Sequence, residues 1–235
     1  LCLDGKCYSI CSLRIGRSRS TSEIGTRMKK YLTATTLCLS ALCSMASLAA
    51  EGDVGVAAAM DDRYCTTCHG VEGIGNIGIE APRLAGMEAW YLKRQLENFR
   101  AGIRGTHGED TQGIAMRPMA AKLSDESIAD IVDWVGDWEY VPAEATVEGD
   151  VRQGRTAFQA CAACHGADAQ GNEALGAPAL AGQNDWYLIT QLRNFRAGFR
   201  GAHQEDTFGS QMVAMSKTLR DDQAVINVVS YINTL

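Results

Sequence analysis

Two short motifs contain the residues best suited to do chemistry in this chain. Each has two cysteines separated by two residues and followed directly by a histidine; the members are Cys65, Cys68 and His69 in the first motif and Cys161, Cys164 and His165 in the second. This spacing is the attachment signature of c-type haem, because two thiols can add to the vinyl groups of the macrocycle while the neighbouring imidazole reaches the iron. We therefore expect two covalently bound haem c groups, with each motif histidine as an iron ligand.

Other uses of paired cysteines fit the sequence less well. A thioredoxin-like dithiol is expected beside a βαβ unit, and no strand pattern is present. A structural zinc ion takes four ligands, whereas each half of the chain offers one cysteine pair and scattered histidines. Five of the nine cysteines precede residue 50, so the haem interpretation uses every cysteine that follows.

The sixth iron ligand decides the function, because a thioether closes the iron and raises its potential, whereas an open position admits a substrate. Two methionines recur in each half; they are Met116 and Met119, and Met212 and Met215. Both pairs lie in polar, glycine-containing segments that we interpret as loops, so we expect one methionine of each pair to bind iron. His107 and His203 are the alternative ligands, although a histidine in a polar loop is more often solvated.

Arg100 and Arg196, at the end of a predicted helix in each half, have two interpretations. Their guanidinium groups suit the carboxylates of haem propionates, which favours a role in cofactor binding. A cation also stabilises the C-terminus of a helix without any ligand. The residues alone leave both roles open.

The elements that must position these residues form a tandem repeat. A shift of 96 residues superposes 65–125 on 161–221 without a gap, with about half of the positions identical, and outside this block the shift becomes 97. We expect two domains, at 51–140 and 149–235, joined by a linker at 141–148.

Each repeat is predicted to contain about three helices and no strand, which gives an all-α fold. The first helix is expected to end before the motif, at Tyr64 and Ala160 in the two repeats. The second carries apolar residues at helical spacing, from Leu92 to Phe99 in the first repeat, and the third begins at the cap candidate Ser124. Such a small unit has a marginal core, so a prosthetic group is expected to fill its centre.

The first 50 residues lie outside the repeat. Met28 opens a basic start, and an apolar run from Leu32 to Leu48 is followed by small residues, as in a secretory signal peptide at 28–50. We interpret residues 1–27, which carry a Ser/Arg-rich patch, as an upstream extension outside the mature protein. The apolar run is short and lacks a stop-transfer cluster, so we predict export to the periplasm and no stable membrane insertion.

The predicted mature chain is acidic. From residue 51 onward it holds 26 acidic and 15 basic residues, which makes nucleic acid a poor partner. Most of the excess lies in 51–145, with 17 acids and 8 bases, whereas 146–235 hold 9 and 7. We therefore expect the first repeat to meet a basic docking surface.

Taken together, these features resemble the dihaem cytochrome c4 family of periplasmic electron carriers, from about residue 51 to the C-terminus. The resemblance rests on both CxxCH motifs, the Ala-Pro-x-Leu-Ala-Gly segments at 81–86 and 177–182, the Tyr-Leu-x-x-Gln-Leu segments at Tyr91 and Tyr187, and a leucine seven residues after Met116 and Met212. It implies two tandem class I cytochrome c-like lobes, each around one haem.

The resemblance also implies roles for particular residues. It selects Met116 and Met212 as axial ligands, and it makes the carbonyls of Pro82 and Pro178 acceptors for the ligating imidazoles, which would orient the rings. Two departures are visible: Arg220 stands where a helix-capping serine is usual, and the repeated Arg-Gly-x-His segments are not a general family feature.

The implied function is that of a soluble carrier of single electrons between redox proteins, such as a membrane-bound terminal oxidase and a periplasmic dehydrogenase, and not of an enzyme. A dihaem peroxidase or sulfur-compound dehydrogenase would need one open iron, and the repetition of every candidate ligand counts against it. A third hypothesis keeps the chemistry and makes the chain the electron-accepting subunit of a dehydrogenase complex.

Overall fold

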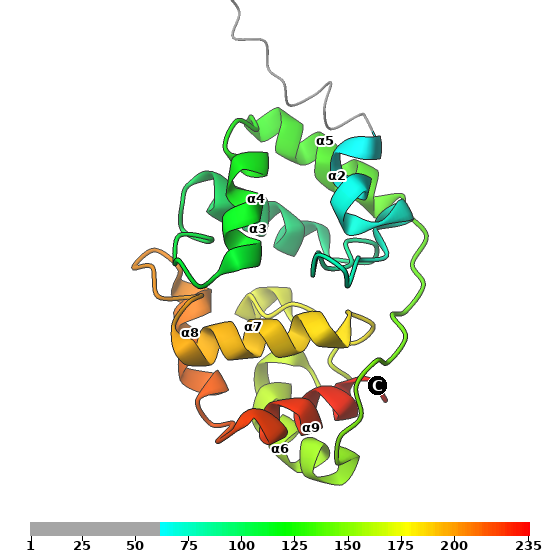
Figure 1. Cartoon of the computed structure of the whole chain (residues 1–235), viewed down its shortest axis with the longest axis vertical. Coiled ribbons are helices and arrows are strands. Elements are labelled where there is room, and N and C mark those ends of the chain that lie inside the picture. Colours follow the sequence, from blue (N-terminus) through cyan, green and yellow to red (C-terminus); the bar gives the residue numbers. More distant parts are fainter. Residues whose placement is uncertain (1–61) are drawn as a thin grey trace, which may run out of the picture. The chain divides into compact units, whose positions relative to one another are not determined.

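The computed structural model describes residues 62–235, whose arrangement is shown in Figure 1. The predicted extension at 1–27 and the predicted signal peptide at 28–50 lie outside the described residues. Within the described part of the chain, no helix is long and apolar enough to cross a membrane.

Two sets of helices follow each other along the chain and form two lobes. The first lobe contains α2 (Asp62–His69), the 3₁₀ turn η1 (Val71–Gly73), α3 (Ala89–Arg100), α4 (Thr111–Ala120) and α5 (Asp125–Gly136). The second lobe contains α6 (Val151–His165), the 3₁₀ turn η2 (Glu173–Leu175), α7 (Asp185–Ala197), α8 (Thr207–Ser216) and α9 (Asp222–Ile232). Over residues 62–235 the β pairing is limited to two equivalent isolated bridges, so the fold is all-α as predicted.

The methionine segments are helices, and interpreting them as loops was wrong. Asp110 accepts a hydrogen bond from the backbone N–H of Gly113, and Asp206 does the same for Gly209. These aspartates are the N-caps of α4 and α8, so the polar stretch that suggested a loop is a helix start. Each lobe therefore has one helix more than the three expected.

The first helix of each lobe continues through its CxxCH motif instead of stopping before it. The helices α2 and α6 end at His69 and His165, and the next residues, Gly70 and Gly166, have φ angles of 80° and 84°. No helix-breaking residue lies inside the motif, and glycine adopts this left-handed φ readily, so the helix ends directly after the histidine.

Each lobe has its own apolar core. In the first lobe α3 packs on α5 through buried residues that include Leu92, Phe99 and Ile128. Ser124 caps α5 by accepting from the N–H of Ser127, as predicted. In the second lobe α9 is capped by Asp221, one position after Arg220, so the one-residue slip of the repeat restores the cap that Arg220 seemed to remove.

The two lobes pack against each other through reciprocal hydrogen bonds, as two copies do about a two-fold axis. Arg104 of the first lobe donates to the Tyr187 hydroxyl and to Gln191 Oε1 of the second, at 3.2 Å each. The equivalent Arg200 donates to the Tyr91 hydroxyl at 2.9 Å and to Gln95 Oε1 at 3.0 Å. Each arginine also donates to the equivalent glutamine of its own lobe, at 2.8 Å and 2.7 Å. These buried bonds explain the repeated Arg-Gly-x-His segments: their arginines join the lobes.

A second reciprocal pair lies where the loops after the motifs meet the other lobe. The N–H of Arg83 donates to Asn184 Oδ1 and the N–H of Ala179 donates to Glu88 Oε1, both at 2.7 Å. Gly75 lies so close to the Asn184 side chain that a Cβ there would collide with it. Glycine is therefore required at this approach.

An extended segment joins α5 to α6 and runs along the second lobe (Figure 1). The N–H of Ala143 donates to the Gly182 carbonyl at 3.1 Å, and the N–H of Val147 donates to Asp185 Oδ2 at 2.9 Å. The predicted linker at 141–148 lies within this segment.

Candidate functional site

The two motif histidines occupy equivalent, buried positions at the ends of α2 and α6. His69 and His165 each expose only 5% of their surface, and the Nδ1 atom of each lies 2.7 Å from the carbonyl oxygen of Pro82 or Pro178. A carbonyl only accepts, so Nδ1 carries the proton and Nε2 keeps its lone pair for a metal. These are the contacts that the resemblance implies.

Burial affects the titration of both imidazoles. The pKa of His69 and of His165 is lowered because the apolar surroundings disfavour the imidazolium, and the hydrogen bond to the proline carbonyl opposes this effect only in part. The neutral ring, which is the form that binds iron, is therefore favoured at neutral pH.

The four motif cysteines form no disulfide with one another, so all four sulfur atoms are available for haem attachment. Cys65 and Cys161 are half-buried against the cores of their lobes, whereas Cys68 and Cys164 are exposed. Burial raises the pKa of Cys65 to about 11, with a smaller contribution from the charge of the nearby Cys68. The pKa of Cys161 is raised in the same way, mainly by burial and secondly by Cys164. In each motif one thiol lies at the core and the other at the surface.

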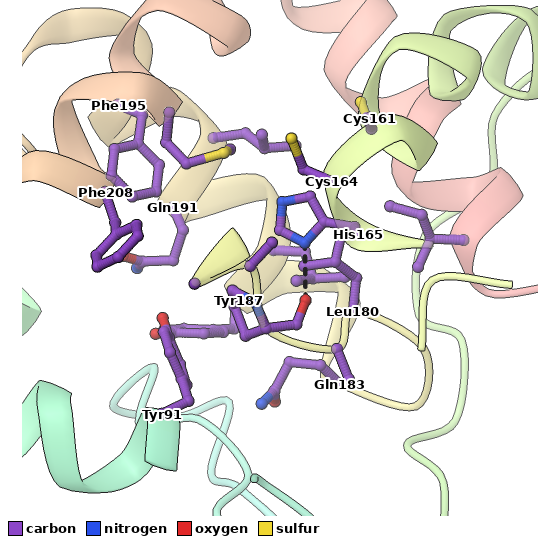
Figure 2. A pocket seen from close by; sticks show the side chains of 18 of the residues that line it. Tyr91, Cys161, Cys164, His165, Leu180, Gln183, Tyr187, Gln191, Phe195 and Phe208 are labelled. Carbon is purple, nitrogen blue, oxygen red and sulfur yellow. Dashed lines mark hydrogen bonds between the residues drawn. The ribbon is translucent and has the colours of Figure 1, made fainter. Parts of the chain in front are cut away.

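A cavity of about 410 Å³ lies in the second lobe and reaches the lobe interface (Figure 2). It is lined by the complete motif, Cys161, Cys164 and His165, and by both methionine candidates, Met212 and Met215. In Figure 2, Cys164 and His165 lie on one side and Phe195 and Phe208 on the other. This size and largely apolar lining suit a bound organic cofactor, and the donor set matches a covalently held haem.

The methionines differ in their surroundings. Met212 is half-buried, whereas Met215, three residues later on α8, is 37% exposed. In the first lobe Met116 packs against the core cluster that also contacts Cys65. The carbonyl of Met119 accepts a hydrogen bond from the Tyr64 hydroxyl at 2.9 Å.

The alternative ligands His107 and His203 lie on exposed loops. The Nδ1 atom of His107 accepts from the N–H of Glu109 at 3.2 Å, and that of His203 accepts from the N–H of Glu205 at 3.3 Å. Neither histidine lines the cavity. The His107 ring also stacks on Phe199, with 4.6 Å between the ring centres.

A family model of cytochrome c matches this chain twice, at residues 55–138 and 151–235. The chain belongs to the cytochrome c family. It is 35% identical over 168 residues to the thiosulfate dehydrogenase electron acceptor of Stutzerimonas stutzeri, covering 65% of this chain and 72% of that protein. It is 28% identical over 178 residues to cytochrome c4 of Azotobacter vinelandii, covering 70% and 82%.

A solved structure supports the same assignment for this cytochrome. Reduced recombinant cytochrome c4 from Pseudomonas stutzeri matches it with a TM-score of 0.59 and 26% identity, over 77% of this chain and 98% of that one. This cytochrome is therefore of the dihaem c4 type, and its two motifs hold two covalently bound haem c groups.

Arg196 does not line the cavity of the second lobe, and Arg100 lies at the equivalent position of the first lobe. Arg100 donates to the Leu123 carbonyl and to Asp125 at the start of α5. Arg196 donates to the Arg220 carbonyl and to Asp222 at the start of α9. These bonds join consecutive helices and favour the structural interpretation of both residues.

Three other arginines line the cavity: Arg83, Arg94 and Arg200. Arg200 had a signal in the sequence, because it recurs as Arg104. Arg83 and Arg94 gave no such signal in the sequence, because the equivalent positions of the second repeat hold Ala179 and Thr190.

Proposed function

We propose that this cytochrome carries single electrons with both irons closed by a histidine and a methionine: His69 with Met116, and His165 with Met212. The observation that carries the proposal is the equivalence of the two sites. Each has a buried histidine oriented by a proline carbonyl and, on a capped helix, a half-buried methionine at the matching position. An enzyme that activates a substrate at one iron would need that equivalence to be broken.

The residues of this chain support rapid exchange of an electron without rearrangement. The bound haem supplies a one-electron Fe(III)/Fe(II) couple. The proline carbonyls hold the imidazole rings in one tautomer and orientation, which would keep the histidine ligands in place in both oxidation states. Core packing covers the Cys65 and Cys161 side of each attachment site, whereas Cys68 and Cys164 are exposed.

The oxidised protein tests this proposal directly. We expect its near-infrared spectrum to show methionine-to-Fe(III) charge-transfer absorption equivalent to two sites per chain, and the reduced protein not to bind carbon monoxide. Absorption equivalent to a single site, together with carbon monoxide binding, would instead identify an enzyme with one open iron.

We further propose that the chain works in the periplasm with a redox protein that has a basic docking surface, a sulfur-compound dehydrogenase being the electron donor. Export is the prediction from 28–50, and the first lobe carries the larger acidic excess. One relative is named as an electron acceptor of thiosulfate dehydrogenase, which supports a donor of that class.

The salt dependence of electron transfer tests the docking proposal. With a thiosulfate dehydrogenase as donor, we expect the second-order rate constant to fall about tenfold or more as ionic strength rises from about 0.01 M to about 0.15 M, because the Debye length shrinks from about 30 Å to about 8 Å. A rate constant independent of salt would contradict a charge-guided encounter. Stopped-flow measurement of haem reduction gives the rate.

A further inference from the structure

Among the described residues, no acidic side chain pairs with the buried Arg83. The residue exposes only 4% of its surface, and its Nε and Nη1 atoms have no hydrogen-bond partner in this part of the chain. Its guanidinium carbon lies 5.3 Å from the centre of the Tyr140 ring, which is a weak attraction for a charge removed from water. A buried guanidinium in this state is costly unless an anion binds to it.

The position of Arg83 is held by the other lobe. Its N–H donates to Asn184 Oδ1 at 2.7 Å, and its carbonyl accepts from Gln183 Nε2 at 3.2 Å. The side chain belongs to the first lobe, yet it lines the cavity that contains His165 and Met212 of the second lobe.

The other charged side chains of this cavity already have partners. Arg94 donates to the Gly176 carbonyl at 2.7 Å, and Arg200 is bound within the reciprocal network. Glu88 accepts from the N–H of Ala179, and Asp206 accepts from the N–H of Gly209. Within the described residues, Arg83 is therefore the cation of this lining whose guanidinium has no hydrogen-bond or ion-pair partner.

We propose that Arg83 binds a carboxylate of the haem held by the second lobe, across the lobe interface. The haem of a c-type cytochrome carries two propionate carboxylates, and a guanidinium is well shaped to bind a carboxylate. The repeat does not duplicate this arginine, because it places Ala179 at the equivalent position. The first lobe thus supplies a cation to the haem of the second lobe, whereas the equivalent Ala179 supplies none to the haem of the first lobe.

The consequence is a difference in reduction potential between the two irons. A cation near a haem stabilises the reduced form, because reduction adds a negative charge. Removing the Arg83 charge is therefore expected to lower the potential of the second-lobe iron and to leave the first-lobe iron nearly unchanged. This inference rests on the electron-carrying role proposed above.

The test is a spectroelectrochemical titration of the haem-loaded protein and of Arg83→Gln, Arg83→Lys and Arg152→Gln. Met212→Ala is expected to lower the potential of the second-lobe iron alone. The redox wave that moves in this variant is therefore assigned to the second lobe. At a fixed applied potential, Arg83→Gln is expected to raise the ratio of oxidised to reduced iron in the second lobe about tenfold, equivalent to about 59 mV. Arg83→Lys keeps the charge and should show less than half of this shift. Arg152→Gln removes an exposed charge of the same sign from α6 and should leave both potentials unchanged.

Three results would overturn the proposal: no shift, an equal shift of both waves, or the same shift for the lysine and glutamine variants, which would indicate packing and not charge. A crystal structure of the loaded wild-type protein tests it without any variant. A guanidinium nitrogen of Arg83 within hydrogen-bond distance of a carboxylate of the second-lobe haem supports it, and any greater separation overturns it. Failure of the proposed histidine and methionine ligation is distinguished from failure of the Arg83 proposal by a different measurement. In that case the oxidised wild-type protein would lack the methionine-to-Fe(III) absorption in the near infrared.

Discussion

Replacing Met212 with alanine is expected to open the iron of the second lobe. The reduced protein should then bind carbon monoxide at one site per chain. The potential of that iron should fall by on the order of 0.2 V, because axial ligands set haem potentials over a range of about 0.8 V and the thioether favours the reduced form. The first lobe should keep its spectrum and its potential. Absorption spectroscopy with carbon monoxide and a redox titration measure both effects.

Met215→Ala is the matched control for this experiment. Met215 lies on the same helix and lines the same cavity, but it is more exposed than Met212. Its loss should leave the iron closed and shift the potential only slightly. If Met215→Ala opened the iron and Met212→Ala did not, the two methionines would have to exchange roles.

Replacing Arg200 with methionine is expected to destabilise the haem-loaded protein by about 3 kcal/mol, the magnitude typical of breaking a buried, charge-assisted network. The substitution removes donors from Gln191, Tyr91 and Gln95, and it leaves their oxygens in a buried interface. Guanidinium unfolding followed by tryptophan fluorescence gives the change in the free energy of unfolding. We also expect the unfolding of the two lobes to separate into two transitions.

The matched control is Arg193→Met. Arg193 pairs with Asp222 on the surface, where the two side chains are 46% and 62% exposed. Such pairs contribute about 0–1 kcal/mol, so the loss of stability should be small. Equal destabilisation by both variants would mean that the network does not hold the lobes together.

The motif and much of the helical framework could be predicted from sequence because they depend on local relations. Two cysteines and a histidine within five residues suit one prosthetic group whatever the rest of the fold does. The apolar residues of α3 recur at helical spacing, and Ser124 sits where a cap belongs, so both were recognisable before the structure was known.

The methionine helices show where local interpretation failed. Polar residues and a glycine are common in loops, but Asp110 and Asp206 place their carboxylates on backbone N–H groups of a starting helix. The same residue types serve a loop and a helix cap, and only the backbone distinguishes them. The sequence analysis was wrong about the secondary structure of these segments, but the candidate methionines remain the same.

By itself, the sequence determined that this cytochrome has two lobes and two covalent haem groups, because attachment chemistry and a 96-residue repeat are encoded along the chain. Only the tertiary structure decided how the lobes meet, which arginines join them, and that Arg83 of one lobe lies in the cavity of the other. The physical reason is separation in sequence: Arg83 and His165 come together through packing across an interface, and no periodicity or motif records such a contact.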